Sequence, residues 1–246
     1  MSKEAKTGEK EKLRDDLSNY SDKDYKSPSV TVDIALMSVV KGKLSVLMMK
    51  RAYPPYRDSW ALPGGFVDIK EGLDTAARRE LEEETGLKGI FLEQLYSFGD
   101  VKRDPRKRVI SVAYFALVPY TDSEKLAGEE ATSYAWFEVD KLPEKLAFDH
   151  DKIIKKAVER IRGKIGYSNV GFELVPEKFT IPELREIFEQ VLGRSLNPSN
   201  FRTKLLKLGI LRATKKKKKM GRGQPAPYYV LDKQALAELE FGETLF

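Results

Sequence analysis

The sequence predicts an α/β fold in which helices cover the faces of a mixed β-sheet, followed by a smaller domain of helices and a hairpin. Apolar, β-branched segments recur between residues 29 and 139 and are separated by turn signals. A patterned helix interrupts them at residues 74–85. Two capped helices and a basic hairpin follow residue 180. The 246 residues suffice for two modest domains.

The first elements are expected to form the sheet. Residues 1–27 are rich in Lys, Glu, Asp and Ser, which predicts a disordered or weakly helical tail. Strands are expected at 29–37 and 44–49, joined by a turn at 41–43, and further strands at 90–98, 109–118 and 133–139. The sheet domain is expected to span residues 28–146.

A glycine- and acid-rich segment interrupts these strands at residues 65–87. Its frame is Gly65, five residues, Glu71, seven residues, then Arg79, Glu80, Leu81, Glu83, Glu84, Gly86 and Leu87. Seven of these identities are fixed by the motif. Because each residue type makes up roughly 5–7% of proteins, a chance match of seven identities at one start position is on the order of 10⁻⁹. Residues 74–85 are predicted to be helical, with Gly86 as a left-handed end.

Three glutamates of this helix point to a metal site. At about 100° per residue, Glu80, Glu83 and Glu84 fall within roughly one 100° sector. Carboxylates this crowded repel each other unless a cation neutralises them. Such oxygen ligands suit Mg²⁺ or Mn²⁺, which would bridge phosphate oxygens and activate water. Leu73, Ala77 and Leu81 occupy the opposite sector and are expected to pack on the sheet.

The segment resembles a complete Nudix box, the signature of enzymes that cleave nucleoside diphosphates linked to another group. The resemblance implies that Glu80, Glu83 and Glu84 bind the metal, with the Gly65 carbonyl as a further ligand. It also implies that Glu71 and Arg79 form an ion pair that braces the loop against the helix. These residues form the predicted catalytic set. A solvated acidic helix face is the alternative, and it is the interpretation preferred for Glu82.

Residues outside the box are weaker candidates. Arg51 ends the second strand and is predicted to contact substrate phosphates; an exposed strand-end arginine is the alternative. Tyr56, with Tyr53 and Trp60, could stack an adenine, although aromatic residues in such loops commonly close the core. Glu129 and Glu130 are candidates for a general base, which a metal-bound hydroxide would make unnecessary.

Composition excludes several classes of site. The chain has no cysteine, so disulfides, zinc–thiolate sites and cysteine nucleophiles are ruled out. The chain has one histidine, His150, so neither a histidine-based metal site nor a Ser-His-Asp triad is expected. A structural role is predicted for His150. No apolar run approaches the roughly 20 residues of a membrane span, and the first residues have no signal core. A soluble cytoplasmic protein without membrane contact is expected.

Charge is concentrated near the C-terminus. Residues 197–222 contain ten basic residues and no acidic one. The net charge is +6, so the remainder carries 6 − 10 = −4. A mildly acidic body with one basic region indicates a nucleic-acid partner, and the elements after residue 146 specify double-stranded DNA.

The elements after residue 146 have the layout of a winged helix-turn-helix. An amphipathic connecting helix is expected within 147–165, and a winged-helix domain within 166–246. Thr180-Ile181-Pro182-Glu183 is a capping box that begins one helix, and Asn197-Pro198 begins a second. Strands at 210–212 and 228–231 would flank a long basic hairpin.

The second of these helices is the predicted DNA-reading helix. Its apolar face carries Phe201, Leu205 and Leu208, and its opposite face suits a major groove. The predicted DNA contacts are Ser199, Arg202, Thr203 and Lys207 on the helix, and Lys215, Lys216, Lys217, Lys218, Lys219 and Arg222 on the hairpin. A solvated lysine loop is the alternative for the hairpin run alone.

The whole arrangement resembles the Nudix-related transcriptional regulators of NAD metabolism and their sugar-responsive relatives. The resemblance covers roughly residues 28–231 and uses segments 28–33, 60–67, 148–150, 179–180 and 200–202. It implies a homodimer, ADP-ribose or a sugar-derived effector in the Nudix pocket, and release of DNA when the effector binds. The boxes of many of these regulators are degraded, whereas this box has every metal-ligand position.

Three hypotheses therefore remain from the sequence. The first is a regulator that senses, and with Mg²⁺ cleaves, ADP-ribose or a related nucleoside diphosphate derivative. The second is a stand-alone Nudix pyrophosphatase with an accessory C-terminal domain, which the basic helix pattern disfavours. The third is a sugar-sensing repressor with a non-catalytic pocket, which the complete set of glutamates disfavours.

Overall fold

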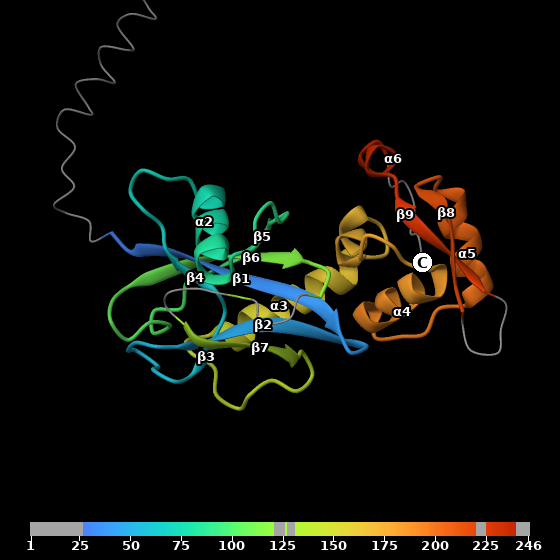
Figure 1. Ribbon diagram of the computed structural model, residues 1–246. Helices are drawn as coiled ribbons and strands as arrows, with labels where there is room; N and C mark the ends of the chain where they lie inside the picture. The colour runs from blue at the N-terminus through green and yellow to red at the C-terminus, as the bar shows by residue number, and fades with distance from the viewer. Residues whose placement is uncertain (1–26, 121–125, 127–130, 220–224, 240–246) are drawn as a thin grey trace, which may run out of the picture.

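The computed structural model describes residues 27–120, 126, 131–219 and 225–239 and confirms the predicted α/β architecture (Figure 1). The predicted tail, both candidate general bases and Arg222 lie outside these residues, apart from residue 27. Within them, a seven-stranded mixed sheet and a separate two-stranded sheet form. No described helix is long and apolar enough to cross a membrane.

The large sheet is built from the N-terminal half of the chain. Its strands and the helix among them are β1 (Ser29–Val40), β2 (Lys43–Arg51), β3 (Trp60–Ala61), β4 (Gly64–Phe66), α2 (Leu73–Thr85), β5 (Glu93–Phe98), β6 (Val109–Leu117) and β7 (Ala131–Glu138). The main order is β3-β2-β1-β6-β5, while β4 also pairs with β1 and β7 with β2. β1 and β6 are parallel, and the other pairs are antiparallel.

Alternate residues of β1 serve two separate cores, because successive strand side chains point to opposite faces. Val32 and Ile34 pack with Ala77 and Leu81 of α2. Ala35 and Met37 belong to the core on the other face, which the connecting helix covers. Figure 1 shows the two helices on opposite faces of the sheet.

The C-terminal half contains the connecting helix and the smaller domain. Its elements are α3 (His150–Lys164), the 3₁₀ helix η3 (Asn169–Leu174), α4 (Ile181–Leu192), α5 (Pro198–Lys207), β8 (Leu211–Lys218), β9 (Ala226–Leu231) and α6 (Lys233–Ala237). The predicted capping box of α4 is present: Thr180 Oγ1 accepts from the Glu183 N–H, and Glu183 accepts from the Thr180 N–H. Asn197 caps α5 through its side chain.

The hairpin differs from its prediction. Its strands are longer than expected, and Lys215 to Lys218 lie in strand β8 rather than in the turn. β8 pairs with β9 again at Lys217 and Lys218, beyond an irregularity in register after Ala213. The backbone pairing therefore extends the strand through residues that have little intrinsic β preference. We call residues 211–231 the basic hairpin.

Helix α3 packs against both the large sheet and the C-terminal helices. Its 15 residues span about 22 Å at 1.5 Å per residue, and Figure 1 shows it running along the sheet towards α4. Ile153, Ile154 and Ile161 are fully or almost fully buried in a core that also contains Phe188 of α4 and Phe201 of α5. One continuous apolar core therefore extends from the sheet to the predicted DNA-reading helix.

Candidate functional site

The glutamates of α2 occupy different environments. The helix ends as predicted, with Gly86 in the left-handed conformation at φ 71°. Glu80 and Glu84 are buried, with exposures of 8% and 3%, whereas Glu83 is exposed. Glu82 is exposed and pairs with Lys88, so its predicted solvated position is confirmed.

Arg79 organises the acidic groups around it. Its Nη2 donates to Glu71 at 2.6 Å, and its Nη1 donates to Glu80 at 2.8 Å and to Glu83 at 2.9 Å. The Glu71–Arg79 ion pair implied by the resemblance is therefore present. The Arg79 hydrogen bond is the main cause that lowers the pKa of Glu71. Arg79 also donates to the Phe66 carbonyl at 3.1 Å and so holds the loop against α2.

The carboxylates do not converge in this structure. Among the described residues, no three acidic or histidine side chains lie close enough to hold a metal ion. Arg79 neutralises Glu80 and Glu83, while Glu84 accepts from the Tyr134 hydroxyl at 3.2 Å. Burial, followed by the Glu84 charge, raises the pKa of Tyr134, which remains a hydrogen-bond donor. A guanidinium thus partly supplies the positive charge that crowded carboxylates require.

The donor chemistry nevertheless fits a divalent cation. A Cβ added to Gly65 would lie 2.3 Å from Glu80 Oε1, so a larger residue here would displace the carboxylate from its present position against the strand. The predicted ligands are all oxygen atoms, which suit Mg²⁺ or Mn²⁺. Nudix hydrolases use divalent cations of this kind.

A cavity of about 400 Å³ opens beside these groups. This volume lies in the range of small-molecule sites. Gly64, Gly65, Arg79 and Glu80 form one side of it. Its other lining residues are Thr31, Asp33, Arg51, Tyr53, Pro54, Leu62, Phe66, Asp68, Arg103, Asp104, Arg106, Phe148 and His150. We call this space the Nudix pocket.

The predicted substrate-binding residues occupy different positions around the pocket. Arg51 lines it, and its guanidinium lies 5.2 Å from the Phe148 ring centroid. Tyr56 is not in the lining; its ring packs edge-on against Phe148 at 4.9 Å. Trp60 packs against Phe137 at 4.8 Å and closes the core. Tyr53 is the candidate aromatic that lines the pocket, with 59% exposure.

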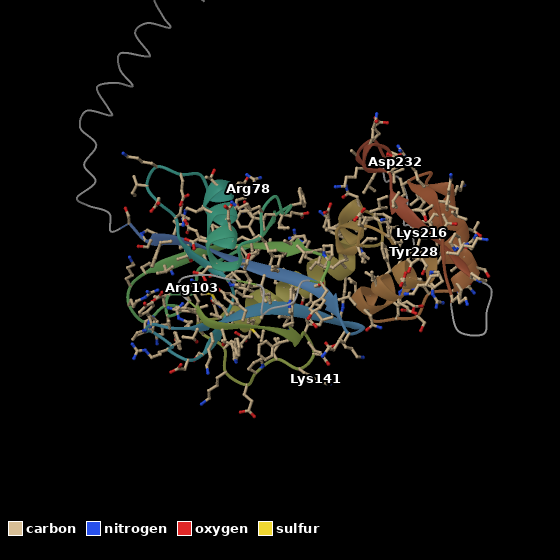
Figure 2. All side chains as sticks on the ribbon, in the orientation of Figure 1. Arg78, Arg103, Lys141, Lys216, Tyr228 and Asp232 are labelled. Atoms are coloured by element: carbon tan, nitrogen blue, oxygen red, sulfur yellow. The ribbon has the colours of Figure 1, made fainter. Side chains whose placement is uncertain are left out.

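A buried charged network lies behind the pocket wall. Arg103 donates from Nη2 to Asp149 at 2.8 Å and to Asp33 at 3.2 Å, and its Nε donates to Asp149 at 3.1 Å. These three residues are 6–7% exposed. Figure 2 places Arg103 at the end of the sheet that lies away from the basic hairpin. The network joins β1, the loop before β6 and the start of α3.

His150 bonds to protein groups, in line with the predicted structural role, and it also lines the Nudix pocket. Its Nδ1 accepts from the Leu62 N–H at 2.9 Å, and its Nε2 lies 3.5 Å from Asp33 Oδ1. Both ring nitrogens therefore face protein groups. Burial raises the pKa of Asp33, but His150, Arg103 and the Ser111 hydroxyl together lower it to about 2. Asp33 is therefore ionised at neutral pH.

The predicted DNA-reading helix presents the expected faces. Phe201 and Leu205 are buried, and Phe201 packs edge-on against Phe188 of α4 at 5.7 Å. The predicted DNA contacts on the helix are all exposed; they are Ser199, Arg202, Thr203 and Lys207. The arrangement leaves a polar and basic surface on α5 that can enter a groove.

The lysines of the basic hairpin are not equivalent. Lys215, Lys216, Lys217 and Lys219 are exposed, and Figure 2 shows Lys216 on the hairpin. Lys218 instead donates to Glu183, the capping-box residue of α4. This hydrogen bond raises the pKa of Lys218. Lys218 is thus held at the protein surface, and its pairing ties the hairpin to α4.

Several pocket residues were not predicted from the sequence. Arg103, Asp104 and Arg106 come from the loop between β5 and β6, and Phe148 precedes α3. A loop rich in arginine and aspartate gives no spacing signal, because its side chains meet the pocket only through the fold. Asp33 and Phe148 lie in two of the segments that carry the family resemblance. That resemblance was the signal in the sequence that could have identified them as pocket residues.

Together, this fold and this site define a class: a Nudix domain joined to a DNA-binding winged helix. The Nudix domain family matches residues 28–157, and the NrtR DNA-binding winged helix domain family matches residues 171–231. The chain therefore belongs to the NrtR family of Nudix-related transcriptional regulators.

Characterised relatives agree with both halves. The ADPR responsive transcriptional repressor NtrR of Acinetobacter baylyi is 37% identical over 87% of this chain and 86% of its own length. The crystal structure of Shewanella oneidensis NrtR complexed with a 27mer DNA superposes with a TM-score of 0.75 at 32% identity, covering 88% of this chain and 99% of that one. The ADP-ribose pyrophosphatase of Methanocaldococcus jannaschii is 38% identical over 53% of this chain and 73% of its own length.

Proposed function

We propose that this protein is a DNA-binding transcriptional repressor whose Nudix pocket binds ADP-ribose or a closely related nucleoside diphosphate derivative. The observation that carries the proposal is the joining, in one continuous core, of a Nudix pocket to a basic winged helix. The name of the Acinetobacter relative supports ADP-ribose as the ligand, and the Shewanella structure, which contains DNA, supports DNA binding. A homodimer and a cytoplasmic location remain predictions.

The pocket suits the chemistry of ADP-ribose. Its diphosphate would lie near the oxygen ligands of α2, and a Mg²⁺ or Mn²⁺ ion held by those ligands would supply positive charge to it. Arg51, Arg103 and Arg106 line the same space and supply positive charge. Tyr53 offers an exposed ring against which a base can stack.

We also propose that the pocket hydrolyses its ligand to AMP and ribose 5-phosphate. A bound divalent cation would polarise phosphorus and lower the pKa of the attacking water. Glu80, Glu83, Glu84 and the Gly65 carbonyl would hold it. For this to occur, Arg79 must give up Glu80 and Glu83 while keeping Glu71, which holds the loop in place. The pyrophosphatase relative supports this activity for the N-terminal domain.

Ligand binding is expected to control DNA binding through the fold. The two sites lie on different domains, so coupling requires that the ligand favour one arrangement of the protein over another. α3 directly connects them and is the element expected to move. A hydrolysis-deficient Glu83→Gln protein that still binds ADP-ribose should release DNA and remain released longer, because it does not consume its ligand.

The experiment that tests this function is a ligand and hydrolysis screen of the full chain. Thermal shift is measured with ADP-ribose, NAD, nucleotide sugars and free pentoses, and hydrolysis is followed with Mg²⁺ and Mn²⁺. Stabilisation by ADP-ribose together with phosphate-bond cleavage supports both proposals. Stabilisation by ADP-ribose without cleavage leaves a sensor and rejects hydrolysis. Stabilisation by free pentoses alone rejects the nucleotide pocket.

A further inference from the structure

Arg103 occupies a position between the Nudix pocket and α3. It lines the pocket, yet its side chain is only 3% exposed because two aspartates hold it from behind. The Nε and Nη2 nitrogens donate to Asp149 and Asp33. Among the described residues, none accepts a hydrogen bond from Nη1. A preorganised guanidinium with one nitrogen remaining suits a phosphate or another anionic oxygen.

The other arginines of the pocket are placed differently. Arg79 belongs to the Nudix box, and Arg106 is bonded to Asp104 through two nitrogens, with its side chain 40% exposed. Arg51 lies beside Phe148 and donates to the Pro55 carbonyl. Arg103 alone among these four also contacts α3, through Asp149. A ligand that contacts Arg103 is therefore linked, through Asp149, to the start of the connecting helix.

Asp149 has a second possible partner within its own helix. It is the N-cap residue of α3, where an aspartate side chain usually accepts from a first-turn N–H. Here it makes no such bond: its carboxylate pairs with Arg103, and its backbone, at φ −114° and ψ 32°, lies outside the extended region usual for a capping residue. Its backbone carbonyl accepts from the Lys152 N–H at 3.1 Å. Capping the helix therefore requires the carboxylate to leave Arg103 and the Asp149 backbone to rotate towards the extended region.

We propose that Arg103 binds the anionic ligand of the Nudix pocket and that Asp149 competes with that ligand for its guanidinium. A phosphate that engages Nη1 and Nη2 together displaces Asp149 from Nη2. The carboxylate of Asp149 then turns to the Asp151 N–H, for which the described residues provide no acceptor. This inference rests on the proposed function, because it requires a phosphate-bearing ligand in the pocket.

The far end of α3 can pass this change to the DNA-binding domain. Arg162 donates from Nε to the Val191 carbonyl at 3.1 Å, in the last turn of α4. Phe188 of α4 packs against Phe201 of α5. A shift at the first turn of α3 therefore reaches the predicted DNA-reading helix through packed, bonded elements.

The test uses Asp149→Asn in the full-length protein. Asparagine caps a helix as well as aspartate does, but it pairs only weakly with Arg103. ADP-ribose should bind the variant about fivefold more tightly, the difference expected between a charge-assisted and a neutral hydrogen bond. Operator affinity without ligand should fall towards the value of the ligand-bound wild type. A purely structural role would not tighten ligand binding.

Two further variants keep the test decisive. Asp151→Asn removes the same charge from the first turn of α3 at an exposed position and should leave both affinities unchanged. Arg103→Lys keeps the charge but loses the planar donors, so ADP-ribose binding should weaken by at least ~10-fold. Calorimetry measures ligand affinity, and fluorescence anisotropy measures operator affinity with and without ligand.

The outcomes separate this inference from the proposed function. If the wild type does not bind ADP-ribose, the proposed function fails first. If the wild type binds it and Asp149→Asn keeps wild-type affinities for ADP-ribose and operator, the competition between ligand and Asp149 is rejected. Wild-type ADP-ribose affinity in a folded Arg103→Lys protein would also reject Arg103 as a ligand contact.

Discussion

The basic hairpin allows a quantitative prediction about DNA binding. Lys215, Lys216, Lys217 and Lys219 are exposed, whereas Lys218 is paired with Glu183. We therefore predict that replacing the four exposed lysines with serine removes most of the hairpin's contribution to DNA affinity. Replacing Lys218 alone should act differently, because it releases the hairpin from α4.

The magnitude follows from counterion release. Each phosphate contact contributes about 0.9 to the slope of log affinity against log salt, so four lost contacts lower the slope by up to about 3.6. Between 50 and 200 mM salt, the wild type should lose on the order of 10²-fold more affinity than the four-serine variant. The loss should be similar for operator and unrelated duplexes, because phosphate contacts carry no sequence information.

The assay is fluorescence anisotropy of labelled duplexes over a series of salt concentrations. Lys141→Ser is the matched control, since Lys141 is exposed on the Nudix domain and pairs with Glu138 (Figure 2). Lys218→Ser should lower the slope by no more than about 0.9 while weakening binding at every salt concentration. A four-serine variant with the wild-type slope would show that the hairpin does not contact phosphates.

Further predictions concern the other parts of the molecule. Glu83→Gln should lower kcat for ADP-ribose hydrolysis by at least ~10²-fold, while the control Glu82→Gln leaves it unchanged. Arg202→Gln should weaken operator binding more than binding to unrelated duplexes, measured by competition. Thr180→Ala should lower the free energy of unfolding in urea by about 1 kcal/mol, because it removes a helix cap. The pKa of Asp33 is lowered to about 2, so its stabilising contribution is complete above about pH 4 and lost as the pH falls towards 2. In the variant Asp33→Asn, the free energy of unfolding should change less with pH over that range. Circular dichroism measured as the pH is lowered checks this.

The sequence predicted the architecture because its local signals agreed with the fold. Each of these signals specifies a conformation within a few residues. They are the periodic strands, the acidic helix that ends at Gly86 and the capping box at Thr180. The strand β8 was predicted too short, because pairing with β9 rather than lysine propensity decides its length. Propensity describes a segment alone, whereas a ladder depends on its partner.

The candidate site was predictable only in part. The Glu71–Arg79 pair follows from a spaced motif, but the network of Arg103, Asp149 and Asp33 joins residues far apart in the chain. No local pattern marks such a contact. The same applies to Lys218, whose place in a lysine run suggested DNA contact, although its side chain bonds Glu183. Long-range contacts decide which of several similar side chains meets a ligand.

The central claim is that the Nudix pocket and the DNA-binding domain are coupled. It is tested most directly by measuring operator affinity across an ADP-ribose titration and, in the same buffer, ADP-ribose affinity with and without operator. The account predicts that ADP-ribose weakens operator binding and that operator weakens ADP-ribose binding by the same factor. Full ADP-ribose occupancy with unchanged operator affinity would contradict it.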